Sequence, residues 1–250
     1  MSKYIRLNIT TEGPTELRFV KDVLFKHFQP YNIFCDHRSV LTSKEYHKRG
    51  GITNYAKVKK DIQQWMSSEN SNDRRFSTMF DYYALPTDFP GYRDAQKLSN
   101  PYDKVKYIEE AFAQDINDNR FIPYIQLHEF ETLLFSDLDV LLLEYEDKRK
   151  EIATLKTVLA QSPFNNNPEL INEKKETSPS HRIIALIPEY QKVSSGSLFA
   201  DLISIDVLRS KCSHFNEWLN RLEKLYFLIM CKKNYFRSIT YLIHGKNYYS

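Results

Sequence analysis

The chain has 250 residues, 42% of them hydrophobic and 27% charged, which is the composition of a folded globular protein and excludes an intrinsically disordered one. Its net charge of +3 is too small to indicate nucleic-acid binding by itself. The three cysteines lack the spacing of a structural zinc site, and the six glycines form no phosphate-binding loop. The longest apolar run, residues 225–231, is too short for a membrane helix, so we expect no membrane partner. The few cysteines and the lack of an amino-terminal apolar signal region predict a cytoplasmic protein.

Strand and helix patterns alternate through residues 1–148. The strand patterns cover residues 4–10, 31–35, 76–83 and 121–127, the last of them interrupted by Pro123. The helical patterns cover residues 14–28, 55–65, 101–115 and 130–145, and a polar loop is expected over residues 41–52. Gly13 can cap the first helix, since Pro14 suits a first helical position. This alternation predicts an α/β fold, with a sheet flanked by helices.

The composition changes after about residue 148. Residues 161–180 are rich in proline and asparagine, which is typical of loops, and the other residues up to 225 are mostly helical in pattern. We therefore predict a mainly helical C-terminal appendage over residues 149–225. The segment 226–250 fits a helix or a pair of strands equally well, and its structure stays open.

Acidic residues follow three of the predicted strands. Glu12 comes after the first strand, Asp81 ends the third, and Glu129 and Glu131 follow the fourth. The carboxyl ends of parallel strands meet at one edge of a sheet, where ligands bind. Carboxylates gathered there repel one another unless a cation lies between them, and Mg²⁺ or Mn²⁺ prefers oxygen ligands. The alternative is a purely structural role, in which each acid is a helix cap or a turn residue.

Several segments resemble one known family. Residues 9–16, Ile-Thr-Thr-Glu-Gly-Pro-Thr-Glu, resemble the first motif of Toprim domains, a strand that ends in Glu-Gly. Residues 79–83, Met-Phe-Asp-Tyr-Tyr, occupy the place of the second acidic motif. Residues 124–134 resemble an element of Toprim-like proteins related to overcoming-lysogenization-defect nucleases. Together with segments 81–91, 178–182 and 212–219, they resemble a Toprim-like family of bacterial proteins formerly of unknown function.

The resemblance implies a Toprim-type core over residues 1–148 that cuts nucleic-acid strands with a metal ion. It makes Glu12 a metal ligand or general acid/base and Asp81 a metal ligand, with Glu131 and Glu129 completing the site. Relatives of this kind often act beside a partner ATPase in anti-phage defence.

One position departs from the Toprim pattern. Toprim proteins usually carry Asp-x-Asp, and here the second acid is replaced by Tyr83. Either Asp88, from the following loop, or Glu131 could take its place as a metal ligand.

Three further residues are candidates for contacts with a substrate. His128 lies beside the acids in the sequence and is either a base or substrate contact, or a packing or capping residue. Arg182 and Lys192 could neutralise phosphate oxygens, with solvation at the surface as the alternative.

The leading hypothesis is a metal-dependent nuclease that cleaves phosphodiester bonds of DNA or RNA with Mg²⁺ or Mn²⁺. The alternative is a non-catalytic interaction subunit of an ATPase complex. A homo-oligomer is compatible with either reading.

Overall fold

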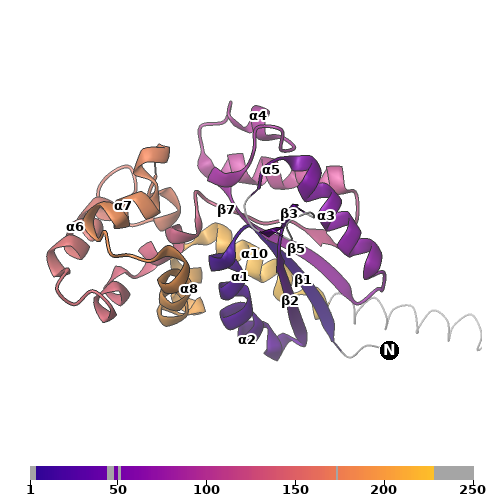
Figure 1. The fold of residues 1–250 in the computed structure, drawn as a ribbon, viewed down its shortest axis with the longest axis horizontal. Helices are drawn as coiled ribbons and strands as arrows, with labels where there is room; N and C mark the ends of the chain where they lie inside the picture. The colour runs from indigo at the N-terminus through magenta and orange to yellow at the C-terminus, as the bar shows by residue number, and fades with distance from the viewer. Residues whose placement is uncertain (1–3, 44–47, 50–51, 173, 228–250) are drawn as a thin grey trace, which may run out of the picture.

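A computed structural model describes residues 4–43, 48–49, 52–172 and 174–227 (Figure 1). A parallel sheet forms its centre, with strand order β2-β1-β5-β6. A fifth strand, β7, also pairs with β5, at the end of β5 that follows the residues paired with β6. These strands are β1 (Ile5–Thr11), β2 (Ile33–Ser39), β5 (Arg74–Asp81), β6 (Phe121–Ile122) and β7 (Ile125–Gln126). The predicted α/β fold with a sheet flanked by helices is confirmed.

Each face of the sheet carries its own apolar core. The alternating residues Ile5, Leu7 and Ile9 of β1 are buried in one cluster, while Phe76 and Phe80 of β5 are buried in the other. Because successive side chains of a strand point to opposite faces, the parallel sheet is covered on both sides. Pro123 separates β6 from β7, as expected for a residue that cannot donate a ladder hydrogen bond.

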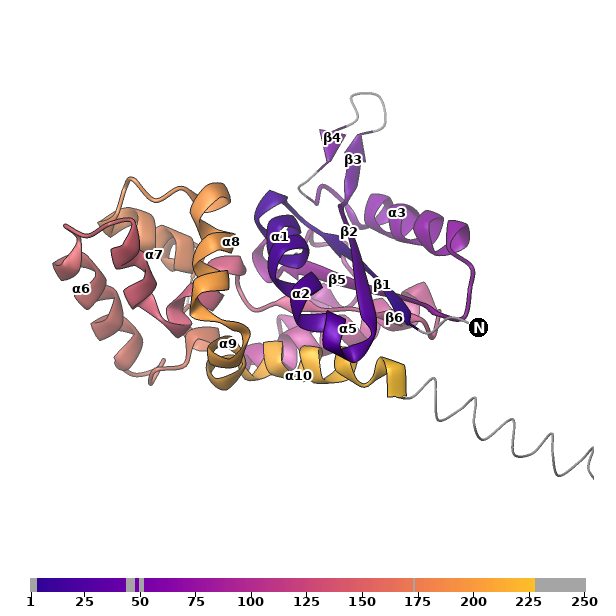
Figure 2. The same ribbon diagram turned by 90° about the horizontal axis from the view of Figure 1, so that it is seen from below.

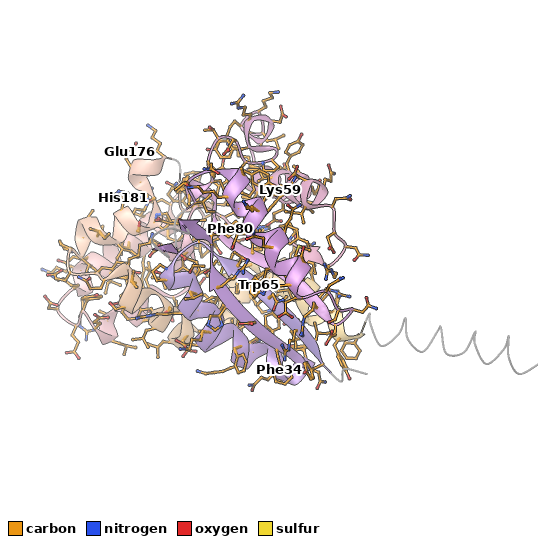
Figure 3. All side chains as sticks on the ribbon, turned by 45° about the vertical axis from the view of Figure 1, so that its right-hand side comes forward. Phe34, Lys59, Trp65, Phe80, Glu176 and His181 are labelled. Carbon is orange, nitrogen blue, oxygen red and sulfur yellow. The ribbon has the colours of Figure 1, made fainter. Side chains whose placement is uncertain are left out.

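Helices cover the two faces separately (Figure 2). On the first face, α1 (Pro14–Phe19) runs through a π-helical segment, η1 (Val20–Leu24), into α2 (Phe25–Phe28) and a 3₁₀ turn, η2 (Gln29–Tyr31). On the second face, α3 (Tyr55–Ser68) and α5 (Pro101–Ile116) enclose the cluster to which Trp65 and Phe80, labelled in Figure 3, belong. Gly13 is the N-cap of α1 and Pro14 its first residue, as predicted.

Two expectations about local structure are wrong. Residues 41–52 are not simply a loop, because β3 (Leu41–Ser43) and β4 (Lys48–Arg49) pair as short antiparallel strands. Residues 130–145 are not one α-helix but two 3₁₀ helices, η4 (Phe130–Ser136) and η5 (Leu138–Leu143). Every residue from Phe130 to Phe135 is buried, so this apolar run has no single helical stripe to mark an α-helix. Two short helices, η3 (Tyr82–Ala84) and α4 (Tyr92–Ala95), lie between β5 and α5.

The predicted helical character of residues 149–225 is confirmed. The elements are α6 (Arg149–Ala160), η6 (Pro168–Leu170), η7 (Lys175–Thr177), α7 (Pro179–Leu186), α8 (Lys192–Ile203), α9 (Ile205–Lys211) and α10 (Ser213–Glu223). The helices α6, α7 and α8 stand beside the sheet as a helical unit (Figure 1). Of the segment 226–250, residues 228–250 lie outside the described residues. Within the described ranges, every helix is too short or too polar to span a membrane.

The last helix, α10, returns from the helical unit to the sheet. Trp218 stacks on Tyr124 with ring centroids 4.3 Å apart, and its indole nitrogen donates to Ser77 Oγ at 2.9 Å. The fully buried carboxylate of Glu169 caps this helix, because it accepts from the backbone amides of His214 at 3.0 Å and Phe215 at 3.1 Å. A charged acceptor at a helix N-terminus satisfies amides that would otherwise be unpaired.

We expect Glu169→Ala to lower the free energy of unfolding by about 3 kcal/mol, because it leaves buried helix amides without a charged acceptor. For a chain of this size that corresponds to a fall in Tm of roughly 6 to 12 °C. The matched control is Glu189→Ala, which removes a 57% exposed side chain paired with Lys148 and should leave the Tm nearly unchanged. Equal losses in the two variants, measured by thermal denaturation, would contradict the capping role.

Candidate active site

The acids predicted from the strand ends lie where the chain reverses its order across the sheet. From β1 the chain crosses to β2 on one side, and it then reaches β5 on the other side of β1. In α/β sheets, ligands bind in the crevice that such a reversal leaves at the carboxyl ends of the strands. Glu12 directly follows β1 and Asp81 ends β5, and the Asp81 amide donates to Glu12 Oε2 at 3.3 Å. The structure thus brings the first two predicted acids together.

Glu129 and Glu131 reach the same edge through a sharp turn after β7. His128 makes this turn with a φ of 62°, and its carbonyl accepts from the Tyr83 amide at 3.0 Å. Both carboxylates then lie beside the ammonium of Lys192, the first residue of α8. The Lys192 Nζ atom is 3.2 Å from Glu129 Oε2 and 2.9 Å from Glu131 Oε2. The helical unit therefore contributes a cation to an edge of the sheet that is otherwise acidic.

A fifth acid, Glu16, belongs to this group and was missed as a site residue in the sequence. It lies in the first turn of α1, is buried, and its Oε2 accepts from the Gly13 amide at 2.9 Å. A Cβ atom at Gly13 would lie 3.1 Å from that oxygen, so glycine leaves room for the carboxylate. The signal was present in the spacing: Glu16 precedes the buried Phe19 and Val20 by three and four residues, so it shares their inward face.

Burial and mutual repulsion govern the charges of these acids. Desolvation, then the neighbouring Glu16 carboxylate, raises the pKa of Glu12 to about 7. Burial raises the pKa of Glu131 to about 7 although Lys192 opposes it, and it also raises the pKa values of Asp81 and Glu16.

Glu129 and Lys192 behave in the opposite way. Burial acts against the Glu129 carboxylate, but the Lys192 ammonium and the Ser180 amide together hold its pKa below the ordinary value. Burial likewise acts against the charge of Lys192, but Glu131 and Glu129 raise its pKa. This pair is therefore charged at neutral pH.

We define the acid cluster by its five carboxyl groups, those of Glu12, Glu16, Asp81, Glu129 and Glu131. These groups outnumber the cationic side chains beside them in the part of the chain that the structure describes. Among the described residues, Lys192 is the one cationic side chain within ion-pair distance of it. Asp81 Oδ1 and Glu131 Oε2 are buried and make no hydrogen bond there, although the second lies close to the ammonium. Buried, unsatisfied carboxylate oxygens are costly, and they are the donors that a hard divalent cation prefers.

The donor chemistry thus fits Mg²⁺ or Mn²⁺, but the side chains as they stand are arranged around the ammonium. In the part of the chain that the structure describes, no three His, Cys, Asp or Glu side chains are grouped so that they could hold a metal ion. Coordination by Glu131 would require the Lys192 ammonium to move, because a second cation beside it is repelled.

The three remaining predicted site residues lie outside the acid cluster. Burial lowers the pKa of His128 to about 4, and the contact of its Nε2 with the Glu169 carbonyl, at 3.0 Å, is that of a neutral packing residue. The guanidinium of Arg182 lies over the ring of Phe164, 5.4 Å from its centroid. The exposed carboxylate of Asp88 accepts from the Tyr55 amide at 3.2 Å, at the start of α3.

Tyr83 and the two residues considered as its replacement lie in different surroundings. Tyr83 is half-buried with its ring 5.6 Å from that of His128, so it packs rather than coordinates. Of the two replacements considered, Glu131 lies in the acid cluster, and Asp88 caps a helix instead.

The chain matches the family described as "Domain of unknown function (DUF4276)" over residues 11–223. It therefore belongs to this family, and the match spans both the sheet and the helical unit. No curated protein and no solved structure matches the chain. The family description states no activity, so the geometry of the acid cluster carries the functional argument.

The raised pKa values of Glu12 and Glu131 predict how stability depends on pH without metal. Between the ordinary value of 4.5 and about 7, the folded protein holds protons on these groups that the unfolded chain has lost. Stability therefore falls as the pH rises through this window, by on the order of 3 kcal/mol per group. We expect Glu131→Gln to reduce this fall in stability by about the amount that one group contributes. The measurement is the free energy of unfolding in urea, with a chelator present, between pH 4.5 and 7.5.

The matched control for this measurement is Glu110→Gln, which alters an exposed side chain on α5 and should leave the slope unchanged. A slope in Glu131→Gln equal to that of the unaltered protein would contradict the raised pKa of Glu131.

Proposed function

For this member of the DUF4276 family, we propose a nuclease that cleaves phosphodiester bonds of DNA or RNA with Mg²⁺ or Mn²⁺. The observation that carries the proposal is the acid cluster: five carboxyl groups gather at the point where the sheet reverses its order, with one ammonium beside them. Such an excess of buried oxygen donors is the usual setting of a hard divalent cation. The resemblance of residues 9–16 and 79–83 to Toprim motifs supports the same reading.

Asp81, Glu12 and Glu131 are the residues that would hold the ion. A bound divalent cation would supply an activated water and neutralise charge on the phosphate. The chain's own contribution is to fix the donors. The Asp81 amide holds Glu12 Oε2, and the Gly13 amide holds Glu16 Oε2. Glu12 would act either as a ligand of the ion or as a general acid or base, and its pKa of about 7 in the metal-free protein suits the second role.

The biological setting follows from the Toprim resemblance alone. We place the activity in the cytoplasm, in anti-phage defence beside a partner ATPase, with nucleic acid as the substrate. Lys192 already lies at the cluster and is the candidate for a phosphate contact, whereas His128 and Arg182 make other contacts. A homo-oligomer remains compatible with these proposals.

One observation favours a second candidate, a non-catalytic interaction subunit of an ATPase complex. Lys192 pairs with Glu129 and Glu131 at the same time, so part of the cluster's charge is neutralised without any metal. A cluster closed in this way could serve only to join the sheet to the helical unit. Calorimetry with Mn²⁺ separates the two, because the non-catalytic subunit has no reason to bind the ion at millimolar concentration.

We expect Asp81→Asn and Glu12→Gln each to lower Mn²⁺-dependent cleavage of labelled DNA or RNA by about 100-fold or more, because each removes a charged oxygen donor. Circular dichroism should report an unchanged fold. Asp88→Asn is the matched control, since its carboxylate lies at the start of α3, and it should retain full cleavage. Undiminished cleavage by both cluster variants would sink the catalytic assignment.

A further inference from the structure

We propose that the Lys192 ammonium is a resident counter-ion that a divalent cation must displace, so that Lys192 sets the metal concentration at which the acid cluster becomes loaded. The inference rests on the proposed function and adds a regulatory element to the same site. When metal is scarce, an ion pair within the chain occupies the site, and no partner protein is needed to keep it so.

The geometry of the ion pairs is that of an occupied cation position. The Nζ atom lies 2.9 Å from Glu131 Oε2 and 3.2 Å from Glu129 Oε2, so it bridges two carboxylates as a bound ion would. Glu131 is completely buried, yet its Oε2 makes no hydrogen bond within the described residues. At 2.9 Å the ammonium is the group that neutralises this oxygen, so a metal ion that binds Glu131 has to take its place.

The ammonium does not satisfy every carboxylate oxygen of the cluster. Asp81 Oδ1 is buried and without a hydrogen-bond partner among the described residues. Among the described residues, one ammonium lies within ion-pair distance of this group of five carboxyl groups, and a divalent cation would neutralise more of them than Lys192 does. A divalent ion cannot share the position with the ammonium, because like charges a few ångströms apart repel strongly at low dielectric.

Lys192 has a route out of the cluster that does not disturb the fold. Its side chain is 39% exposed although its ammonium contacts buried acids, so part of the side chain already reaches solvent. It is the first residue of α8, and the next residue, Val193, is 43% exposed. Further along the helix, α8 packs closely on α1, since a Cβ at Gly196 would lie 3.0 Å from Thr15 Cγ2. We therefore expect the displacement to be a swing of the Lys192 side chain and not a shift of α8.

The first test measures Mn²⁺ binding by calorimetry in the full chain and in Lys192→Met, which keeps the length of the side chain and removes its charge. We expect the variant to bind Mn²⁺ about tenfold more tightly or better, because the competing charge is gone. Lys156→Met is the matched control: it breaks the exposed pair with Asp139, outside the acid cluster, and should leave the affinity unchanged.

The second test needs no variant, and it decides the matter if Lys192→Met does not fold. An amine-reactive reagent is applied to the unaltered protein with and without saturating Mn²⁺, and labelled lysines are identified by mass spectrometry. Displacement of the ammonium predicts a several-fold rise in labelling of Lys192 on adding Mn²⁺ and no change at Lys156.

The outcomes separate this inference from the proposed function. If the unaltered protein binds Mn²⁺ and Lys192→Met binds it no more tightly, the counter-ion role is overturned and the nuclease proposal stands. Labelling of Lys192 that stays constant or falls with saturating Mn²⁺ overturns it equally. If neither protein binds Mn²⁺, the proposed function fails, and the inference fails with it.

Discussion

The double ion pair of Lys192 with Glu129 and Glu131 is the interaction on which the arrangement of the site depends. It joins a helix of the helical unit to the turn that follows β7, and so it ties the helical unit to the carboxyl edge of the sheet. Without a cation at this point, five largely buried carboxyl groups would gather at one edge of the sheet, where charge is costly. The rest of the fold supplies the stability that keeps them there.

That stability comes from apolar clusters on the two faces of the sheet and from the anchoring of α10. Trp218 packs on Tyr124 against the sheet, and the buried Glu169 caps the helix that carries it. Both contacts involve residues beyond position 148, so the helical region is not merely appended to the sheet. One cluster of buried residues in fact contains side chains from β1, α1 and α10 together.

The sequence was informative where a local pattern determines local structure. The alternation of Ile5, Leu7 and Ile9 and the Gly13-Pro14 pair were enough to place Glu12 at a strand end. It was not informative where tertiary contacts decide. In the run over residues 130–145, every residue from 130 to 135 is buried, so its first part lacks the exposed face of a surface α-helix. Whether Asp88 or Glu131 joins the cluster depends on which loop folds back, and spacing along the chain carries no such information.

The two carboxylates beside Lys192 are not equivalent, and the difference indicates what a metal ion would change. Glu129 accepts from the Ser180 amide at the start of α7 as well as from the ammonium, and its pKa is held low. Glu131 has a raised pKa although the Lys192 ammonium lies 2.9 Å from its Oε2. An entering cation therefore gains most by taking Glu131, and the Lys192 ammonium leaves the cluster in exchange. Glu131, Glu12 and Asp81 then form the part of the site that a metal ion would occupy.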